Sequence, residues 1–516
     1  MDTSSRTAKS IKNAKVALGF YAINLVLQFF SRKVFLDYLG AEVLGLNTTA
    51  QNLIGFLNLA ELGIGAAIAF TLYKPLFERD TCSINEIVSV QGWLYRRVAY
   101  IVIAGACILM CFFPLIFEKA QVPLWYTYGS FIALLISALL GYFVNYRQIV
   151  LTADQKEYKV TLNVQGFKLL KVFVQIVAIA YLVNGYIYWI VLEVLTSIIT
   201  AIALDKLLKR EYPWLKTDVI YGGKLRKKYP EIITKTKQLF FHRIGFFVLT
   251  QTSPLIIYAY TSLVLVAIYG NYMLIVTGVT LLMDAFFKSV SAGVGNLVAE
   301  GYKEKIKKVF WELTIHRIWL ASIICFGIYK LSHSFITLWV GPDFIMEQSA
   351  FIALVVVAFI GLTRTNDAFI SAYGLFQDVW SPIVEAILNL GLSILLGYYY
   401  GLTGILSGVI ISQLIVVCSW KPFFLYKYGF KERGGEYAIR LFRLLVLISL
   451  SFISVSWFCD SLFPNSIDSF RQWVLYALFT ILSYSTFSSC LFLCVDPAAR
   501  SCATRLKSLL ISKKAK

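Results

Sequence analysis

Charged residues are scarce in this sequence, and histidine is almost absent. Among 516 residues, 15% are charged and three are histidines, whereas 58% are hydrophobic and the mean hydropathy is +0.71. Soluble globular domains carry about 25% charged residues, so a water-soluble enzyme is excluded. The sequence also has no GxxxxGK(S/T), HExxH or GxSxG motif, so nothing indicates an ATP-driven pump, a zinc protease or a serine hydrolase.

The residues that usually hold metals or cofactors form no site either. His242, His316 and His333 lie far apart in the sequence, and the nine cysteines lack the spacing of a zinc site or a disulfide framework. The sequence therefore predicts neither a metal nor a cofactor.

Long apolar runs dominate what is present. They continue for twenty residues or more, which fits helical spans of about 20 residues and not the alternating strands of a membrane β-barrel. We expect an all-α integral membrane protein with about fourteen transmembrane helices. The expected spans are 14–36, 43–73, 90–117, 122–145, 165–183, 186–204, 239–260, 264–298, 309–340, 350–374, 380–399, 402–426, 440–462 and 470–495.

The basic residues indicate the orientation of the chain. The 48 Lys and Arg outnumber the 29 Asp and Glu, and they crowd the two tails and every second connection between the spans. Because cytoplasmic connections are enriched in Lys and Arg, both termini are expected in the cytoplasm. The excess of positive charge is thereby explained without a nucleic-acid partner.

The longest basic connection divides the sequence in two. Six spans precede it and six follow, as in transporters built from internal repeats. We expect an N-terminal six-helix lobe at 1–204 and a basic cytoplasmic linker at 205–238. A C-terminal six-helix lobe at 239–430 and two extra helices with a basic tail at 431–516 would follow.

Ionisable residues inside the expected spans are the candidates for function, because a charge at a helix centre costs about 2.5–3.5 kcal/mol on insertion scales. Cations that line a cavity would bind an anionic substrate, whereas acids would bind a coupling sodium ion or proton or form structural hydrogen bonds. The candidate cations are Arg364, Arg243, Arg317 and Lys288, and the candidate acids are Glu61, Asp284, Glu193 and Asp367.

Structural roles for these charges remain open. Asp284 and Lys288 are four residues apart and Arg364 and Asp367 are three apart, so each pair could neutralise itself on one helix face. Arg243 and Arg317 could instead snorkel to the cytoplasmic surface. Arg364 is too deep for that, and its fork of N–H donors suits a pyrophosphate.

Two segments resemble the polysaccharide flippases of the multidrug/oligosaccharidyl-lipid/polysaccharide (MOP) exporter superfamily. The first is FLDYLGAEVLGLNTTAQNLIGFLNLAELGIGAAIAFTLYKPL at 35–76, with an LGxxxxG turn before an ELGIG helix. The second is EAILNLGLSILLGYYYGLTGILSGVIISQLI at 385–415, which is similar to the eleventh and twelfth helices of the family. The resemblance covers about residues 12–430 and implies a MATE-like fold of two lobes around a central cavity.

The resemblance also implies a function. Such flippases move undecaprenyl-pyrophosphate-linked oligosaccharides to the outer leaflet of the bacterial inner membrane, by alternating access, for O-antigen or capsule synthesis. Polysaccharide polymerases and glycosyltransferases would then be partners, together with membrane lipids. Two alternatives remain: a MATE-type exporter of drugs or organic cations coupled to sodium or protons, and a membrane glycan polymerase or ligase. The short non-cytoplasmic connections leave little room for an active site, which favours a transporter over an enzyme.

Overall fold

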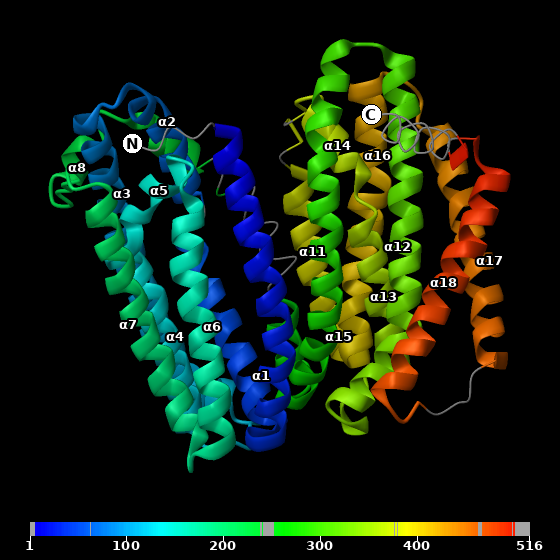
Figure 1. Ribbon diagram of the computed structural model, residues 1–516, viewed down its shortest axis with the longest axis horizontal. Coiled ribbons are helices and arrows are strands. Elements are labelled where there is room, and N and C mark those ends of the chain that lie inside the picture. Colours follow the sequence, from blue (N-terminus) through cyan, green and yellow to red (C-terminus); the bar gives the residue numbers. More distant parts are fainter. Residues whose placement is uncertain are drawn as a thin grey trace. The chain divides into compact units, whose positions relative to one another are not determined.

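The computed structural model describes residues 6–61, 63–237, 240, 252–375, 377–378, 380–462, 467–497 and 499–500. These residues form helices and connections, with no strand among them. The chain folds into two compact units, Met1–Ala267 and Ile268–Lys516, each of them a helical bundle (Figure 1).

Eleven helices in the described part of the chain are long and apolar enough to cross a membrane. Two of them, Lys12–Leu57 with 46 residues and Trp380–Phe430 with 51 residues, are twice as long as the roughly 20 residues that one span requires. Each contains a glycine with non-helical backbone angles, Gly40 and Gly401 respectively, and so provides two spans. The predicted all-α membrane architecture is confirmed.

Unit 1 contains the N-terminal spans. Its helices are α1 (Arg6–Leu57), α2 (Ile64–Glu78), α3 (Thr81–Ile116), α4 (Leu124–Phe143), α5 (Ile149–Ala153), α6 (Glu157–Tyr181), α7 (Gly185–Glu211), α8 (Gly222–Leu225) and α10 (Ser253–Tyr260), with 3-10 turns η1 (Asn58–Glu61) and η2 (Asn145–Gln148) and the start of α11 (Leu263–Glu300).

The chain reverses direction at Gly40, as the two expected spans 14–36 and 43–73 require. Gly40 has a φ of 84°, in the region that favours glycine. Before it, Asn24 donates a hydrogen bond to Gln165 of α6. After it, Asn47 accepts one from Tyr186 near the start of α7, and Figure 1 shows the chain returning beside α6 toward α2.

The second expected span, 43–73, is not one continuous helix. It ends at Leu57, passes through η1 and resumes as α2 at Ile64. Gly63 has a φ of 94°, and this left-handed conformation breaks the helix directly after Glu61. The break exposes backbone groups beside an acidic side chain.

The expected linker 205–238 packs against α3 over its described residues. Asn85 of α3 accepts a hydrogen bond from the backbone N–H of Lys216, and Ser89 accepts one from that of Asp218. Gly222 lies so close to α3 that an added Cβ would come within 2.4 Å of the Ser89 carbonyl oxygen. The linker is therefore a fixed part of unit 1 up to residue 237.

Unit 2 contains the rest of α11 and the C-terminal spans. Its further elements are α12 (Lys303–Trp339), the 3-10 turn η3 (Pro342–Phe344), α13 (Gln348–Leu362), α14 (Thr365–Ala372), α15 (Trp380–Gln413), α16 (Lys421–Phe424), α17 (Gly435–Leu462) and α18 (Phe470–Val495). Two π-helical segments, η4 (Leu414–Trp420) and η5 (Leu425–Phe430), precede and follow α16.

Glycines hold the α15 hairpin together. Gly401 turns the chain with a φ of 55°, and the two arms then touch through backbone atoms. A Cβ on Gly404 would lie 1.9 Å from the Leu396 carbonyl oxygen, and one on Gly408 would lie 2.4 Å from the Ser393 nitrogen. Close backbone approach through small residues is typical of packing within membranes. The tight hairpin expected between 380–399 and 402–426 is confirmed.

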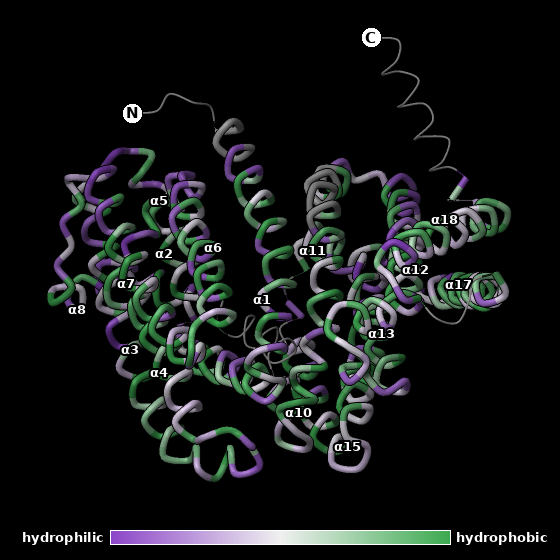
Figure 2. Tube along the Cα trace, turned by 60° about the horizontal axis from the view of Figure 1, so that its bottom comes forward, coloured by the Kyte–Doolittle hydropathy of each residue, from purple (hydrophilic) through white to green (hydrophobic). Residues whose placement is uncertain are grey.

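The last two helices pack on α12. Phe326 of α12 stacks on Tyr484 of α18 at 4.2 Å between ring centroids, and Lys330 forms an ion pair with Asp460 of α17 at 2.7 Å. Apolar side chains such as Ile453 and Trp457 point outward and are exposed, as expected for a lipid-facing surface. In Figure 2 hydrophobic green residues run along α17 and α18.

Candidate functional site in unit 2

A break in the tenth expected span, 350–374, forms the centre of the site. Helix α13 ends at Leu362 and α14 begins at Thr365, and Arg364 between them has a non-helical ψ of 55°. A helix break inside a membrane leaves carbonyl and N–H groups that water cannot reach, so protein side chains must satisfy them. Polar residues gather at this point for that reason.

Arg317 of α12 satisfies the carbonyl groups of the break. Its Nε donates to the Leu362 carbonyl at 2.7 Å and its Nη1 donates to the Arg364 carbonyl at 3.3 Å. Its third contact is an ion pair of 3.6 Å with Asp284 of α11. Arg317 is thus engaged inside unit 2, where the sequence left snorkelling open.

Arg364 pairs with a different helix. Its Nη2 lies 3.4 Å from Oε1 of Glu385 on α15. The Glu385 side chain is 2% exposed and that of Arg364 is 25% exposed, so the arginine side chain is partly open while the carboxylate is enclosed.

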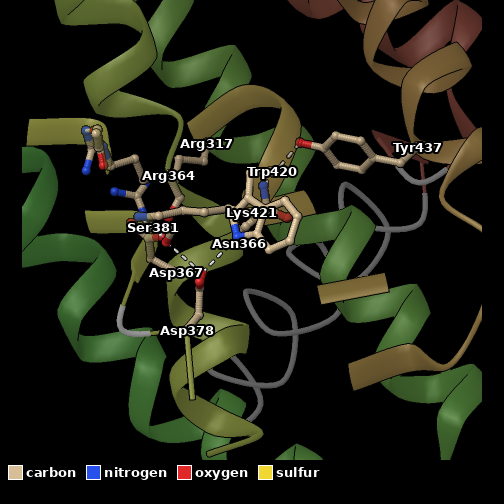
Figure 3. A network of polar contacts seen from close by, with 10 residues as sticks. Arg317, Arg364, Asn366, Asp367, Asp378, Ser381, Trp420, Lys421 and Tyr437 are labelled. Atoms are coloured by element: carbon tan, nitrogen blue, oxygen red, sulfur yellow. Dashed lines mark hydrogen bonds and ion pairs between the residues drawn. The ribbon is translucent and has the colours of Figure 1, made fainter. Parts of the chain in front are cut away.

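Asp367 completes a second ion pair at the same place. Lys421 of α16 donates to Asp367 Oδ1 at 2.8 Å (Figure 3). Nearby, Asp378 accepts hydrogen bonds from Ser381 and from the indole of Trp420. The sequence placed Lys421 inside the span 402–426 but did not single it out, although a lysine in that apolar run was the signal.

The sequence left open a pair between Arg364 and Asp367 on one helix face, and the structure instead pairs each of them with a residue of another helix. They lie three residues apart, yet the break turns them to Glu385 and Lys421 respectively. Asp284 pairs with Arg317 of α12, and the side chain of Lys288, which could also pair with it, is not described. Three basic and three acidic side chains of the described residues form these pairs, so no surplus of cations exists among them.

Two of the four candidate cations cannot be placed with these. Arg243 lies outside the described residues, and Lys288 lies in α11 at a position whose side chain is not described. Their part in a site stays a prediction.

The break also carries polar atoms without partners. Thr365 Oγ1 and Asn366 Oδ1 are buried and accept no hydrogen bond within the described structure. The Asn366 amide nitrogen donates to Tyr437 at 3.2 Å (Figure 3). Buried polar atoms without partners cost free energy, and they mark a place where water or a ligand would bind.

In unit 1, Glu61 lies at the break between η1 and α2. Tyr95 of α3 donates to Glu61 Oε1 at 2.7 Å, and Tyr142 of α4 donates to Asn58 Oδ1 at 2.8 Å. The two tyrosine rings meet edge to face at 5.6 Å between centroids. The Glu61 carboxylate, the Asn58 amide oxygen and the hydroxyl groups of Tyr95 and Tyr142 thus lie close together. Such oxygen atoms can bind a hard cation, and the carboxylate can bind a proton.

Glu193 of α7 has a structural environment. Lys171 of α6 donates to its Oε1 at 2.7 Å, and Gln175 donates to its Oε2 at 3.3 Å. The side chain of Glu193 is 7% exposed and that of Lys171 is 17% exposed, so the carboxylate is buried and the lysine is partly buried. Lys171 was a further charge in an apolar run that the sequence reasoning did not use.

No protein-family model matches the sequence, and no curated protein matches it. Solved structures match by fold. The lipid II flippase MurJ in an inward closed conformation matches with a TM-score of 0.65 and 15% identity, over 93% of this chain and 99% of MurJ. A multidrug resistance MATE family transporter of the MOP superfamily, in an inward-facing conformation, matches with a TM-score of 0.59 and 13% identity, over 81% of this chain and 99% of that transporter. The chain therefore has the MATE-like fold that the resemblance implies.

Proposed function

We propose that this chain is a flippase that moves undecaprenyl-pyrophosphate-linked oligosaccharides from the cytoplasmic to the outer leaflet by alternating access. The observation that carries the proposal is the half-open Arg364–Glu385 pair at a helix break inside the membrane. An arginine fork binds two phosphate oxygens at once, so a pyrophosphate can occupy the open side of Arg364. Lipid II, which MurJ is named for flipping, supports a lipid-linked cargo by fold analogy alone.

The charge balance at the site suggests how cargo would be bound and released. In the described structure Glu385 already neutralises Arg364, so an anionic cargo must compete with an internal carboxylate. Such competition lets binding energy open the pair and lets the carboxylate expel the cargo afterwards. Lys421, Arg317, Arg243 and Lys288 are proposed as further cations for the pyrophosphate or for acidic sugars.

The cellular setting follows from the same proposal. The distribution of basic residues supports a multi-pass protein of the bacterial inner membrane with both termini in the cytoplasm. O-antigen or capsule assembly is the proposed pathway class, with a polymerase and glycosyltransferases as partners.

Leaflet accessibility in proteoliposomes tests the proposal. A membrane-impermeant enzyme that modifies the glycan should reach only the outer-leaflet fraction of a lipid-linked oligosaccharide in empty vesicles and nearly all of it with the protein. The double variant R364Q/E385Q, which removes both charges together, should lose at least tenfold in rate. E385Q alone should slow flipping, because the carboxylate that expels the cargo is lost, and R433Q, at an exposed arginine, serves as the matched control.

Two results would overturn the proposal. One is a wild-type rate in R364Q/E385Q at equal abundance. The other is no exposure of several glycans by folded protein under imposed ion gradients. A change in glycan length or linkage would instead identify a polymerase or ligase.

A sodium- or proton-coupled exporter of organic cations is the second candidate, and Glu61 is the observation that favours it. Its carboxylate accepts a hydrogen bond from Tyr95 at a helix break in unit 1, and acids within membrane spans are candidates for ion coupling. Uptake of a cationic dye into vesicles, driven by a sodium or proton gradient and abolished in E61Q, would support this function. Asp284, Glu193 and Asp367 are each bound to a basic side chain and are weaker candidates for coupling.

A further inference from the structure

Helix α3 shows where the surface of the bilayer meets unit 1. Residues 98–117 contain no charged side chain, and these 20 residues match the roughly 20 that one span requires. Arg96 and Arg97 directly precede this run, and both are exposed. Ile101 and Ile108 within it are exposed apolar side chains, as expected for a face in contact with lipid. The hydrocarbon core therefore begins near residue 98, and Arg97 lies at the level of the lipid headgroups.

The basic linker packs against α3 at this same level. A Cβ on Gly222 would lie 2.7 Å from the Cβ of Trp93, and one on Gly223 would lie 2.8 Å from the Trp93 indole nitrogen. Trp93 precedes residue 98 by five positions, which is a rise of about 7.5 Å along the helix. The headgroup region on each side of the hydrocarbon core is about 5–7.5 Å thick. Residues 218–227, which we name the linker turn, thus lie beside the headgroups.

The linker turn presents two apolar side chains outward. Val219 is buried, whereas Ile220 is 82% exposed and Tyr221 is 57% exposed. The Asp218 carboxylate accepts hydrogen bonds from the backbone N–H groups of both exposed residues, at 3.0 and 3.3 Å, and so fixes the backbone that carries them. Figures 1 and 2 both show α8, which follows directly, at the edge of unit 1 farthest from α1. Tyrosine at the boundary between membrane and water is typical of membrane anchors.

The acidic side chains at this level are fewer than the basic ones, and each of them has a role in the protein. Residues 80–97 of α3 and its cap, together with residues 216–228, contain seven basic and three acidic side chains. Glu86 forms an ion pair with a lysine of the linker. Asp80 accepts a backbone N–H at the start of α3, and Asp218 holds the linker turn. Positive charge therefore exceeds negative charge around the linker turn.

Three of the basic side chains belong to the linker turn and are exposed: Lys224, Arg226 and Lys227. None of the three forms an ion pair with a carboxylate of the described residues. The Lys224 ammonium lies 5.4 Å from the ring centroid of Tyr221, and the Arg226 guanidinium lies 5.1 Å from that of Trp93. Positive charges thus stand directly beside aromatic rings at the level of the headgroups.

We propose that the linker turn is a membrane anchor that binds anionic phospholipid headgroups. Ile220 and Tyr221 enter the interfacial region, and Lys224, Arg226 and Lys227 contact the lipid phosphates. Basic residues next to a membrane surface strengthen binding to anionic lipids by about fivefold each. The anchor belongs to unit 1 and does not depend on the cargo of the proposed flippase.

Photocrosslinking of the full-length protein in vesicles tests the anchor. The photoreactive residue p-benzoylphenylalanine replaces Ile220, whose side chain lies outside the core. The vesicles contain phosphatidylcholine and phosphatidylglycerol in a ratio of seven to three. After irradiation, intact-mass spectrometry should show one added lipid, with phosphatidylglycerol at least fivefold over-represented relative to its share of the vesicle. The same probe in place of Ile453, an exposed apolar residue of α17 in unit 2, should give adducts that follow the vesicle composition.

Variants connect the lipid selectivity to the lysines. K224Q/K227Q should lower the phosphatidylglycerol excess at residue 220 at least threefold, while Arg226 stays in place to hold its contact with Trp93. K303Q/K308Q removes two exposed lysines at the start of α12 and changes the net charge equally, so it is the matched control. That control should leave the excess at residue 220 unchanged.

Three outcomes would overturn the anchor. The first is the absence of lipid adducts at residue 220 when the probe at residue 453 forms them, because the linker turn would then not reach the bilayer. The second is a crosslink from residue 220 to another part of this chain or to a second copy, which would mean that protein covers the turn. The third is a phosphatidylglycerol excess that is missing, or that is equal in the wild-type protein and K224Q/K227Q.

Discussion

Nη2 of Arg364 lies 3.4 Å from Oε1 of Glu385, and the two groups differ in exposure, with 25% of the arginine side chain and 2% of the carboxylate side chain accessible. The pair joins a helix break to the hairpin helix α15. A buried carboxylate depends on its partner far more than a partly open guanidinium does, because desolvation of the lone charge is costly. This asymmetry permits a stability experiment that is independent of transport.

The first prediction concerns that asymmetry. R364Q leaves Glu385 buried without a counter-charge and should lower the free energy of unfolding by about 2–3 kcal/mol. R364Q/E385Q removes both charges and should recover most of that loss. Unfolding in detergent, followed by circular dichroism, measures both. A double variant no more stable than R364Q would contradict the coupling between the two residues.

The second prediction concerns Arg317 as the cap of the helix break. R317K keeps a positive charge near Asp284. A lysine ammonium, however, cannot donate to the Leu362 and Arg364 carbonyls at the same time as the planar guanidinium of Arg317 does. Hydrogen bonds to charged groups contribute about 1.5–3 kcal/mol each, so a loss in this range is expected. Amide hydrogen exchange should accelerate at 362–366 in R317K, and unchanged protection there would refute the capping role.

Much of the fold could be predicted from the sequence because the length of an apolar run determines whether it can span the membrane. The chain reverses at Gly40 and Gly401 because each of these glycines lies between two apolar runs that are each long enough for one span. The position of the break at Gly63 could not be predicted, because one glycine in an apolar run is also common in continuous membrane helices. The left-handed conformation of Gly63 depends on tertiary packing, which the spacing of apolar residues in the sequence does not reveal.

The sequence indicated which charged residues form the site but not which of them pair with each other. Depth in the membrane identified Arg364, and the same criterion applied to Lys421 would have found it too. Partners could not be assigned, because spacing along one helix assumes an intact helix. At Arg364 the helix is interrupted, and the neighbours come from α12, α15 and α16.

The third prediction tests the pair between Lys421 and Asp367 by exchange of charges. K421D and D367K each place two like charges at a contact of 2.8 Å and should both be destabilising. The double variant K421D/D367K restores an opposite pair, although Asp367 is 37% exposed and the recovery should be only about 0.5–1 kcal/mol. Thermal unfolding of the four proteins gives the coupling energy, and additive effects would show that the pair contributes nothing.

The fourth prediction concerns the basic linker, which the sequence read as a plain connection. Two guanidinium groups lie over the ring of Trp93 in α3, that of Arg97 at 3.9 Å and that of Arg226 from the linker at 5.1 Å from the ring centroid. Lys228 and Tyr229 of the linker both donate to Glu86 of α3 at 2.6 Å. The contact with this carboxylate raises the pKa of Lys228, so the lysine stays fully charged at neutral pH.

Removal of the Trp93 ring should release the linker without unfolding α3. The Arg226 contact with Trp93 contributes about 0.5–1 kcal/mol at an exposed site, so W93A should raise the open population about two- to fivefold. Trypsin, which cleaves after Lys and Arg, should then cut near 224–228 faster by the same factor, since cleavage follows the open population when reclosing is fast. W457A, at a tryptophan that is 75% exposed in α17, is the matched control. Equal cleavage rates of W93A and W457A would mean that the hydrogen bonds to Asn85, Ser89 and Glu86 hold the linker without the ring.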